Sequence, residues 1–363
     1  MQYTISELAK ALEAQAVGDT SLTIHRLSEP GSAGPGDLAL ASNRKYAEAL
    51  ADGTAEAAML WADADWQALG LKAAILPERP RYALSYLTRV MDQGQGFAPG
   101  IHPSAIIDSS AVIGENVSIG PGTIIAAKAE IGAGSVIGPM CVVGWQAVLG
   151  QDTYLREHVS IGARVRIGDR FHAHPGVRIG GDGFSFVTPE KSGAEAVRET
   201  LGGQGHTKDQ HWSRIASLGG VEIGDDVELG ANSVIDNGTI RATRVGDRTK
   251  IDGLCHHGHN EVVGNDTQIS GQVDVTSSAT VGDFVVLAGQ CGIADNISIG
   301  NRVVITAATK VMSSVRDGKV MMGYPAAEMK THLEGYKALR RLPRFLRDVS
   351  ELKKAVFKTD TSD

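Results

Sequence analysis

The feature that most constrains this chain is a six-residue repeat between Ile107 and Ile179. An apolar or small residue recurs at every sixth position, and a glycine usually follows it. Two residues before each of these positions stands a small or β-branched side chain, with Phe171 as the one large member of the set. A period of six fits neither an amphipathic helix nor a simple hairpin. It is typical of a solenoid built from hexapeptides.

The spacing also predicts how such a solenoid is built. Residues two apart in a strand share a face, so the aliphatic and the small residue of each hexapeptide both point inward. We expect the following glycine to turn the chain at a corner. Three such faces close a coil of roughly eighteen residues, and stacked coils bury one continuous apolar column. The pattern therefore predicts a mainly β fold, a parallel β-helix.

The N-terminal residues 1–95 lack the repeat and are predicted to form a separate α/β domain. Thr4 and Glu7 have the spacing of a capping box, which would open a helix running through Ala14. The string DLALASNRKYAEAL, residues 37–50, predicts a strand that leads into a helix.

The remainder of the chain is predicted to be the β-helix and a helical extension. Residues 101–325 carry the repeat, with a slip of four residues before Val245. It is interrupted by a polar insertion at 188–213, whose role the pattern does not define. Residues 326–363 are predicted to form a C-terminal helical segment, with a possible break at Pro343.

Composition excludes some classes of function. A net charge of −7 and a pI near 5.9 argue against a general nucleic-acid binder. The start, MQYTISELAKAL, lacks the features of a signal peptide, and no apolar run is long enough for a membrane span. We therefore expect a cytoplasmic protein. Cys141, Cys255 and Cys291 occupy the small inward position of the repeat, so we expect buried, inert thiols.

One hexapeptide violates the repeat twice. His257 stands where an aliphatic residue belongs, and Glu261 stands where a small one belongs. Burying polar groups costs roughly 1–3 kcal/mol each unless they are partnered. The two residues are therefore either a private buried pair or part of a functional site. His259 lies between them, faces outward, and is the stronger functional candidate.

Beyond the repeat, the chain resembles a known family over nearly its whole length, the UDP-3-O-(3-hydroxyacyl)glucosamine N-acyltransferases of lipid A biosynthesis. A hexapeptide period alone would be weak support for this, but the non-repeating N-terminal domain and the histidine motif are specific. The motifs that carry the resemblance are Asn-x-x-Tyr at Asn43 and Tyr46, GIHPSA at 100–105, GGDGF at 180–184, I-D-x-x-C-x-x-x-H-N from Ile251 to Asn260, and A-G-Q-x-G-I-A from Ala288.

The resemblance implies a fold, a reaction and partners. The solenoid would be left-handed, and three copies would form a homotrimer with sites between neighbouring prisms. The enzyme would transfer a 3-hydroxyacyl chain from acyl carrier protein to the 2-amine of UDP-3-O-acyl-glucosamine. No metal or resident cofactor is implied, because the 4'-phosphopantetheine is carried by the donor acyl carrier protein. The length of the acyl chain is not defined.

The resemblance also implies roles for residues near the histidine motif. His259 would be the general base that takes a proton as the amine attacks the thioester. Asp252 is the candidate for holding the tautomer of the imidazole; its alternative is a solvated corner aspartate. Asn260 and Asn296 would contact the substrate. The family usually has Gly-His where this chain has Asp295 and Asn296, and an asparagine can donate hydrogen bonds but cannot carry a proton.

In the N-terminal domain, Asn43 and Tyr46 would bind the uridine part of the substrate. The alternative is a turn asparagine and an interface tyrosine. The family often has an aromatic residue three positions before Asn43 that packs on the uracil, and this chain has Leu40 there.

The C-terminal segment is locally basic in an acidic protein, with Arg340, Arg341 and Arg344 at its centre. Because the resemblance implies an acidic acyl carrier protein as donor, these arginines are the predicted docking residues. A solvated helix face is the alternative. One short helix is a poor nucleic-acid site.

Three other functions remain open at this point. A zinc enzyme of the γ-carbonic anhydrase kind would need three neutral histidines, and His256, His257 and His259, or His172 and His174, are candidates. Another hexapeptide sugar acyltransferase, transferring to oxygen or using coenzyme A, would not need this N-terminal domain. A scaffold without catalysis would not need His259.

Overall fold

The computed structural model describes residues 2–200, 208–323 and 326–356. It divides into two compact units, Met1–Phe97 and Ala98–Asp363. The division falls inside the linker that separates the non-repeating residues from the first hexapeptides. We describe each unit by itself.

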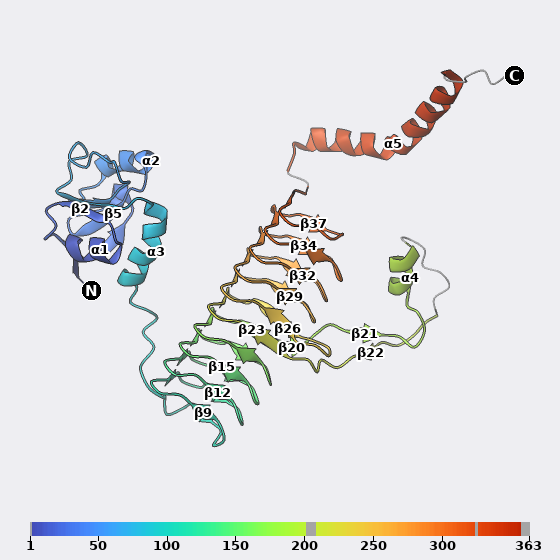
Figure 1. Cartoon of the computed structure of the whole chain (residues 1–363), viewed down its shortest axis with the longest axis horizontal. Helices are drawn as coiled ribbons and strands as arrows, with labels where there is room; N and C mark the ends of the chain where they lie inside the picture. The colour runs from blue at the N-terminus through green and yellow to red at the C-terminus, as the bar shows by residue number, and fades with distance from the viewer. Residues whose placement is uncertain (1, 201–207, 324–325, 357–363) are drawn as a thin grey trace. The chain divides into compact units, whose positions relative to one another are not determined.

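The N-terminal unit is a five-stranded sheet with helices on both faces (Figure 1). The strands lie in the order β2-β7-β6-β5-β4, and only β2 runs antiparallel to its neighbour. One face packs on α1 and α3, and the other on α2 and the 3-10 turns η1 and η2. The bounds are β1 Tyr3–Thr4, α1 Ile5–Ala11, β2 Gln15–Gly18, β3 Thr23–Ile24, β4 Arg26–Ser28, η1 Pro30–Ser32, β5 Asp37–Leu40, α2 Arg44–Ala47, η2 Glu48–Asp52, β6 Ala57–Met59, β7 Ala73–Leu76 and α3 Pro80–Met91.

The local predictions for this unit are confirmed, with one boundary corrected. The Thr4 side chain accepts from the Glu7 N–H while the Glu7 carboxylate accepts from the Thr4 N–H, which is the predicted capping box. The helix ends at Ala11, three residues before the predicted Ala14. Glu13 adopts a left-handed φ of 51°, which turns the chain out of the helix. The predicted strand and helix at 37–50 are β5 and α2.

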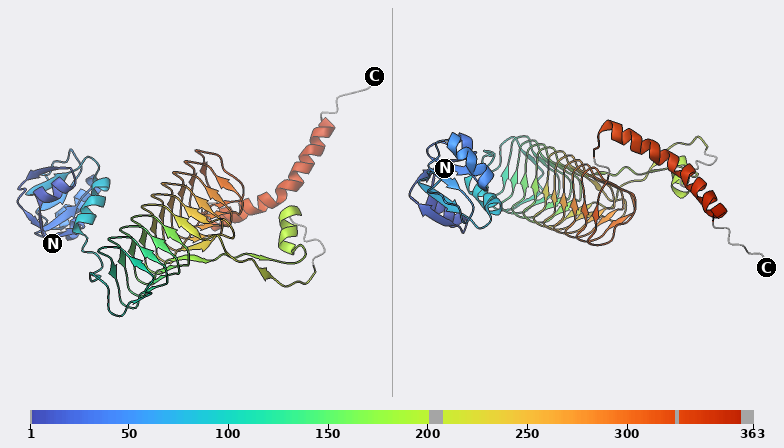
Figure 2. Two further views of the ribbon diagram at one scale, coloured as in Figure 1. Left: turned by 60° about the horizontal axis from the view of Figure 1, so that its bottom comes forward. Right: turned by 90° about the horizontal axis from the view of Figure 1, so that it is seen from above.

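The second unit is a parallel β-solenoid with three faces (Figures 1 and 2). We call them the first, second and third face in the order in which the chain meets them from β8. They hold ten, nine and ten strands. Most strands are two residues long and pair with the strand one coil away, as Ile125 does with Val143. The mainly β solenoid predicted from the repeat is confirmed.

The strands of the first face are β8 Ile106–Ile107, β11 Ile124–Ile125, β14 Val142–Val143, β17 Ser160–Ile161, β20 Arg178–Asp182, β25 Val234–Asn237, β28 His256–His257, β31 Asp274–Val275, β34 Gly292–Ile293 and β37 Lys310–Val311. Those of the second are β9 Val112–Ile113, β12 Glu130–Ile131, β15 Val148–Leu149, β18 Arg166–Ile167, β23 Val221–Ile223, β26 Thr243–Val245, β29 Val262–Val263, β32 Thr280–Val281 and β35 Ser298–Ile299. Those of the third are β10 Ser118–Ile119, β13 Val136–Ile137, β16 Tyr154–Leu155, β19 His172–Ala173, β24 Glu228–Leu229, β27 Lys250–Ile251, β30 Gln268–Ile269, β33 Val286–Leu287, β36 Val304–Ile305 and β38 Val320–Met321.

The corners between the faces correct the role predicted for the glycines. We call the turn from first to second face the first corner, from second to third the second corner, and from third to first the third corner. The left-handed residue of a corner comes three positions after the inward aliphatic, as at Gln146 with φ 58°. The glycine that follows the aliphatic instead permits close stacking of coils. A Cβ added to Gly144 would lie 2.7 Å from the backbone carbon of Gly162.

The inward residues form one buried apolar column through the stack. Cys141, Cys255 and Cys291 belong to it, and all three are buried and free. Burial raises the pKa of the Cys141 thiol to about 11, and also raises the pKa of the other two thiols. The prediction of buried packing thiols is confirmed, and a raised pKa disfavours the reactive thiolate.

A row of acidic and amide side chains links the coils along the second corner. In each step, an Oδ1 accepts a hydrogen bond from a backbone N–H of the preceding coil, with N–O distances of 2.7–3.0 Å. We call this row the second-corner ladder. Its members are Asp169, Asp225, Asp247, Asn265, Asp283, Asn301 and Asp317.

The predicted insertion leaves the stack at the first corner, after β20 (Figure 1). We call residues 183–217 the lobe. It contains an antiparallel pair, β21 Phe186–Val187 with β22 Ser213–Arg214, and the helix α4 Gly193–Thr200. Residues 201–207, including His206 of the predicted insertion, lie outside the described residues.

The C-terminal segment is the helix α5, Met329–Val356, which includes Pro343. The helix therefore continues through the predicted break, and its ribbon changes direction partway along (Figure 1). None of its side chains is buried. Residues 357–363 lie outside the described part. Over the described ranges, we find no helix with the length and apolarity that crossing a membrane requires.

Candidate active site

The irregular hexapeptide lies at the first corner, between β28 and β29. His257 pairs in register with Ile235 before it and Val275 after it, so its side chain points into the column. His257 and Glu261 have no exposed surface, whereas His259 is half-buried at the corner. The predicted inward and outward directions are confirmed.

His257 and Glu261 form the private buried pair. The His257 Nδ1 lies 3.0 Å and 3.1 Å from the two carboxylate oxygens of Glu261. Burial raises the pKa of the Glu261 carboxyl, although the nearby imidazole opposes the rise. Among the described residues, the His257 Nε2 is buried without a hydrogen-bond partner. The pair is therefore a polar group buried among the inward residues of the stack.

The polar contacts of the His259 imidazole are all made by one ring nitrogen, Nδ1. Its Nδ1 lies 3.0 Å from the Asn260 Nδ2 and 3.2 Å from the Thr239 Oγ1. The Asn260 Oδ1 accepts the Thr239 backbone N–H at 2.7 Å, which fixes the orientation of the amide. Asn260 is also the left-handed residue of this corner, with φ 63°. Within the described residues, Nε2 has no hydrogen-bond partner, so it is the ring nitrogen left for a substrate.

The start of the lobe passes directly over His259. A Cβ added to Gly183 would lie 2.7 Å from the His259 Cβ and 2.9 Å from its Cδ2. The Gly183 N–H donates to the Ser217 Oγ at 3.0 Å. This hydrogen bond joins the first and last residues of the lobe, where the chain leaves the stack and returns to it. A glycine is therefore required here for the lobe and the imidazole to fit together.

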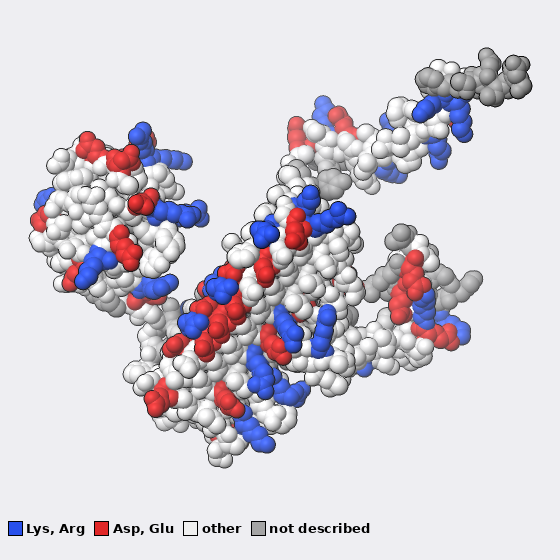
Figure 3. Space-filling view, in the orientation of Figure 1, with Lys and Arg blue, Asp and Glu red and all other residues white. Residues whose placement is uncertain are grey.

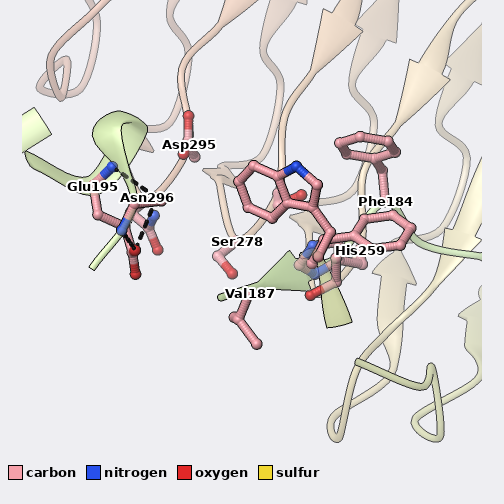
Figure 4. Close-up of a pocket in the computed structure, with 12 residues that line it drawn as sticks. Phe184, Val187, Glu195, His259, Ser278, Asp295 and Asn296 are labelled. Atoms are coloured by element: carbon pink, nitrogen blue, oxygen red, sulfur yellow. Dashed lines mark hydrogen bonds between the residues drawn. The ribbon is translucent and has the colours of Figure 1, made fainter. Parts of the chain in front are cut away.

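A pocket of about 750 Å³ opens beside His259, between the lobe and the first corner (Figure 4). Its lobe wall carries four large apolar side chains, and its solenoid wall is polar. Asn296 and His259 both line it, so the structure brings these two predicted residues together. The lining residues are Phe184, Ser185, Phe186, Val187, Ser192, Glu195, Trp212, His259, Ser277, Ser278, Asp295 and Asn296.

The structure does not bring Asp252 to His259 within one chain. Asp252 follows β27 at the third corner, where its carboxylate accepts the N–H groups of Gly253 at 2.7 Å and Gly271 at 3.0 Å. His259 stands one face away, at the first corner. Within one chain, Asn260 and Thr239 contact Nδ1, and a role for Asp252 in the reaction stays a prediction.

Asn260 and Thr239 change the assignment of roles at the corner. Asn260 was predicted to contact substrate, but its amide is occupied by Thr239 and by the ring of His259. The sequence did not reveal Thr239 at all. It lies in the slipped stretch between β25 and β26, where the six-residue spacing no longer assigns directions.

The histidines proposed as zinc ligands diverge. His256 points outward from β28, where its ring nitrogens lie 3.3 Å from the Asp236 Oδ2 and 2.9 Å from the Asp274 Oδ1. Those carboxylates, Asp236 first, raise the pKa of His256 to about 9. His257 points inward, and His259 stands at the corner. The three cannot share a metal within one chain.

The second histidine pair lies on the third face. The rings of His172 and His174 stack with centroids 4.8 Å apart, and the His174 Nε2 lies 2.9 Å from the Glu228 Oε1. Burial lowers the pKa of His172. In the described ranges, no three His, Cys, Asp or Glu residues are grouped so that they could hold a metal ion.

In the N-terminal unit, Asn43 and Tyr46 lie together at the start of α2. The Asn43 Oδ1 accepts the Tyr46 N–H at 3.2 Å and so caps the helix. The Tyr46 ring is half exposed, at 50%. The cap leaves the amide N–H₂ of Asn43 available, and binding of uridine by these residues stays a prediction.

The predicted docking arginines are exposed on α5. Arg340, Arg341 and Arg344 all face solvent, and the Arg340 guanidinium lies 6.0 Å from the centre of the Tyr336 ring. Figure 3 shows Lys and Arg side chains along this helix.

Two known proteins are similar to this chain over nearly its whole length, and other matches cover part of it. Residues 101–144 match the model of the bacterial transferase hexapeptide family (six repeats). The UDP-3-O-acylglucosamine N-acyltransferase of Ruegeria pomeroyi is 62% identical over all of both chains. That of Paracoccus denitrificans is 58% identical over 99% of this chain and 98% of its own. The crystal structure of Arabidopsis UDP-N-acetylglucosamine acyltransferase is 20% identical, covers 62% of this chain and 71% of its own, and has a TM-score of 0.49.

Proposed function

The chain belongs to the UDP-3-O-acylglucosamine N-acyltransferases, and we propose that His259 carries the acyl transfer to the 2-amine of the UDP-sugar. The observation that carries the proposal is the geometry of one imidazole. Its Nδ1 is held by Asn260 and Thr239, and its Nε2 is left for a substrate beside a pocket that also contains Asn296.

The chemistry follows from that placement. The amine nitrogen attacks the carbonyl carbon of an acyl thioester, an N–C bond forms, and the C–S bond breaks. In the tautomer that this step requires, Nδ1 carries the hydrogen and donates it to the Thr239 Oγ1. Nε2 then takes the proton that the amine loses and passes it to the departing thiolate, so the products are an amide and a thiol. A positioned base of this kind contributes roughly 10²–10⁴-fold. The reaction needs no cofactor held by the protein.

The donor is proposed to be a 3-hydroxyacyl chain on acyl carrier protein. Support comes from the exposed arginines of α5, because a strongly acidic carrier would be attracted to a basic helix. A cytoplasmic location, predicted from the N-terminal sequence, stays a prediction.

The active enzyme is proposed to be a homotrimer. Asp252 contacts no imidazole in one chain, so a role for it in the reaction would require a second copy of the chain. Light scattering on active enzyme should give the mass of three chains, and an active monomer would remove this part of the proposal.

The test is an assay with 3-hydroxyacyl thioesters of acyl carrier protein and UDP-3-O-acylglucosamine. His259→Ala should lower kcat by roughly 10²-fold or more while circular dichroism stays unchanged. The matched control is His102→Ala, an exposed histidine on the first coil, which should keep its rate. Full activity of His259→Ala would disprove the assignment.

A further inference from the structure

The pocket beside His259 has two chemically different walls. The first corner contributes only polar side chains: His259, Ser277, Ser278, Asp295 and Asn296. The opposite wall is formed by the lobe, which contributes all the large apolar side chains, Phe184, Phe186, Val187 and Trp212, together with Ser185, Ser192 and Glu195. Figure 4 draws the residues that line the pocket, with Phe184, Val187, His259 and Asn296 among those labelled.

Phe184, Val187 and Trp212 are exposed in the single chain. Phe184 is 85% exposed and Trp212 is 60% exposed, and neither belongs to the core of the solenoid. The Phe184 and Phe186 rings meet edge to face with centroids 5.1 Å apart, and the Arg214 guanidinium lies 4.6 Å from the centre of the Phe186 ring. Large exposed apolar side chains gathered at one place mark a binding surface.

We propose that the lobe is the acyl-chain wall of the active site, with Phe184 and Trp212 as residues that determine chain-length specificity. This inference rests on the proposed function. A reacting molecule with a sugar at one end and an aliphatic chain at the other matches a pocket that is polar on one wall and aromatic on the other. Gly183 fixes the aromatic wall to the catalytic imidazole, because its Cα passes too close to His259 for any side chain.

The aliphatic chain has two sources in this reaction, the donor thioester and the 3-O-acyl group of the acceptor. Both present the same chemistry to the wall, and the experiment separates them. One arm varies the donor chain from 10 to 16 carbons with a fixed acceptor. The other arm varies the 3-O-acyl chain of the acceptor with a fixed donor.

The expected effect follows from burial of methylene groups. Each methylene that moves from water onto an apolar wall favours binding roughly fourfold, so two more should raise kcat/KM by about 15-fold. Phe184→Ala and Trp212→Ala should bring this ratio close to one in the arm whose chain lies on the wall. Val187→Trp, which fills part of the pocket, should shift the preference toward shorter chains.

The matched control is Phe284→Ala. Phe284 is also an exposed aromatic, at 56%, but it stands at the second corner and does not line the pocket. This variant should keep the chain-length ratios of the wild type in both arms. Circular dichroism checks that every variant is folded.

Each outcome decides the proposal. A flattened dependence in the donor arm assigns the wall to the donor chain, and one in the acceptor arm assigns it to the acceptor chain. Unchanged ratios in both arms for Phe184→Ala and Trp212→Ala would overturn the inference while leaving the proposed function intact. Absence of activity in the wild type would instead disprove the proposed function.

Discussion

The buried pair of His257 and Glu261 predicts an unusual pattern of stabilities. Neighbouring coils have Ile235 and Val275 at the position of His257. At the position of Glu261 the preceding coil has Thr243 and the following coil has Ala279. His257→Ile should therefore fit the column sterically but leave a fully buried carboxylate without its partner. Removing one member of a buried ion pair costs about 3–5 kcal/mol. Glu261→Ala leaves the His257 Nδ1 without its hydrogen-bond partner, which costs about 1–3 kcal/mol.

The double variant His257→Ile/Glu261→Ala should recover most of that loss. It removes both polar groups, including the His257 Nε2 that has no partner among the described residues. Replacing a buried pair by apolar residues of similar volume is often neutral, or stabilising by about 1–4 kcal/mol. The interaction energy in this double-mutant cycle should therefore be several kcal/mol, because the two residues act as one unit.

The dependence on pH gives a second, independent readout. Burial raises the pKa of Glu261 in the folded state above its ordinary value of 4.5. Between the ordinary pKa and the raised pKa of the folded state, the folded protein binds more protons than the unfolded chain. The contribution of this carboxyl to stability therefore falls as pH rises. His257→Ile removes the imidazole that opposes the rise, so its stability should fall further with pH, by up to about 1.4 kcal/mol per pH unit. The double variant should lack this contribution.

Urea unfolding followed by circular dichroism, at one protein concentration and at several pH values, measures these differences. Equal stability of His257→Ile and the wild type at pH 7 would refute the reasoning. It would mean that the carboxyl of Glu261 is satisfied by another group or is neutral in the fold.

Three further predictions concern the site and its partners. Gly183→Ala should lower kcat strongly without unfolding the solenoid, because the new Cβ would displace His259; a wild-type rate would place the lobe farther from the imidazole. Asn43→Ala and Tyr46→Ala should raise the Kd for the UDP-sugar, measured by calorimetry, more than they lower kcat, and unchanged affinity in both would remove α2 from the site. Replacing Arg340, Arg341 and Arg344 with Ala should raise KM for acyl carrier protein thioesters and remove its salt dependence, which acts over a Debye length of about 8 Å at 0.15 M. A small pantetheine thioester should show neither effect, and equal changes for both donors would exclude α5 as the docking surface.

The periodicity predicted most of the fold because each hexapeptide specifies its own direction. Counting in sixes predicts that His257 and Glu261 point inward and that His259 faces outward. The same counting separates Asp252 from His259. Asp252 follows the inward Ile251 of the third face, whereas His259 follows the inward His257 of the first, so one whole face lies between them. The resemblance to the family suggested their pairing, and the spacing separates them within one chain.

The features that the sequence did not reveal depend on contacts between coils or on lost periodicity. The glycine after each inward residue was assigned to turning the corner, but its main constraint is the backbone of the next coil, which no local pattern contains. Thr239 and Ser217 lie where the repeat slips or leaves the stack, so counting gives them no direction. The position of Phe184 and Trp212 on one wall depends on how β21 and β22 pair across the lobe.

Because the second-corner ladder holds the coils in register, the length and sequence of the chain that leaves at the first corner can vary. Its steps join residues 18 apart in a regular coil, 22 apart across the slip, and 56 apart from Asp169 to Asp225 across the lobe. The hydrogen bond is 2.8 Å long in the ordinary step from Gln151 to Asp169 and in the step that spans the lobe. Register is thus kept at a corner that does not line the pocket, although 56 positions separate the two members of the step across the lobe. Relatives could therefore lengthen, shorten or exchange the lobe during evolution without redesigning the stack beneath it, and an engineer could graft a different lobe at Asp182 for the same reason.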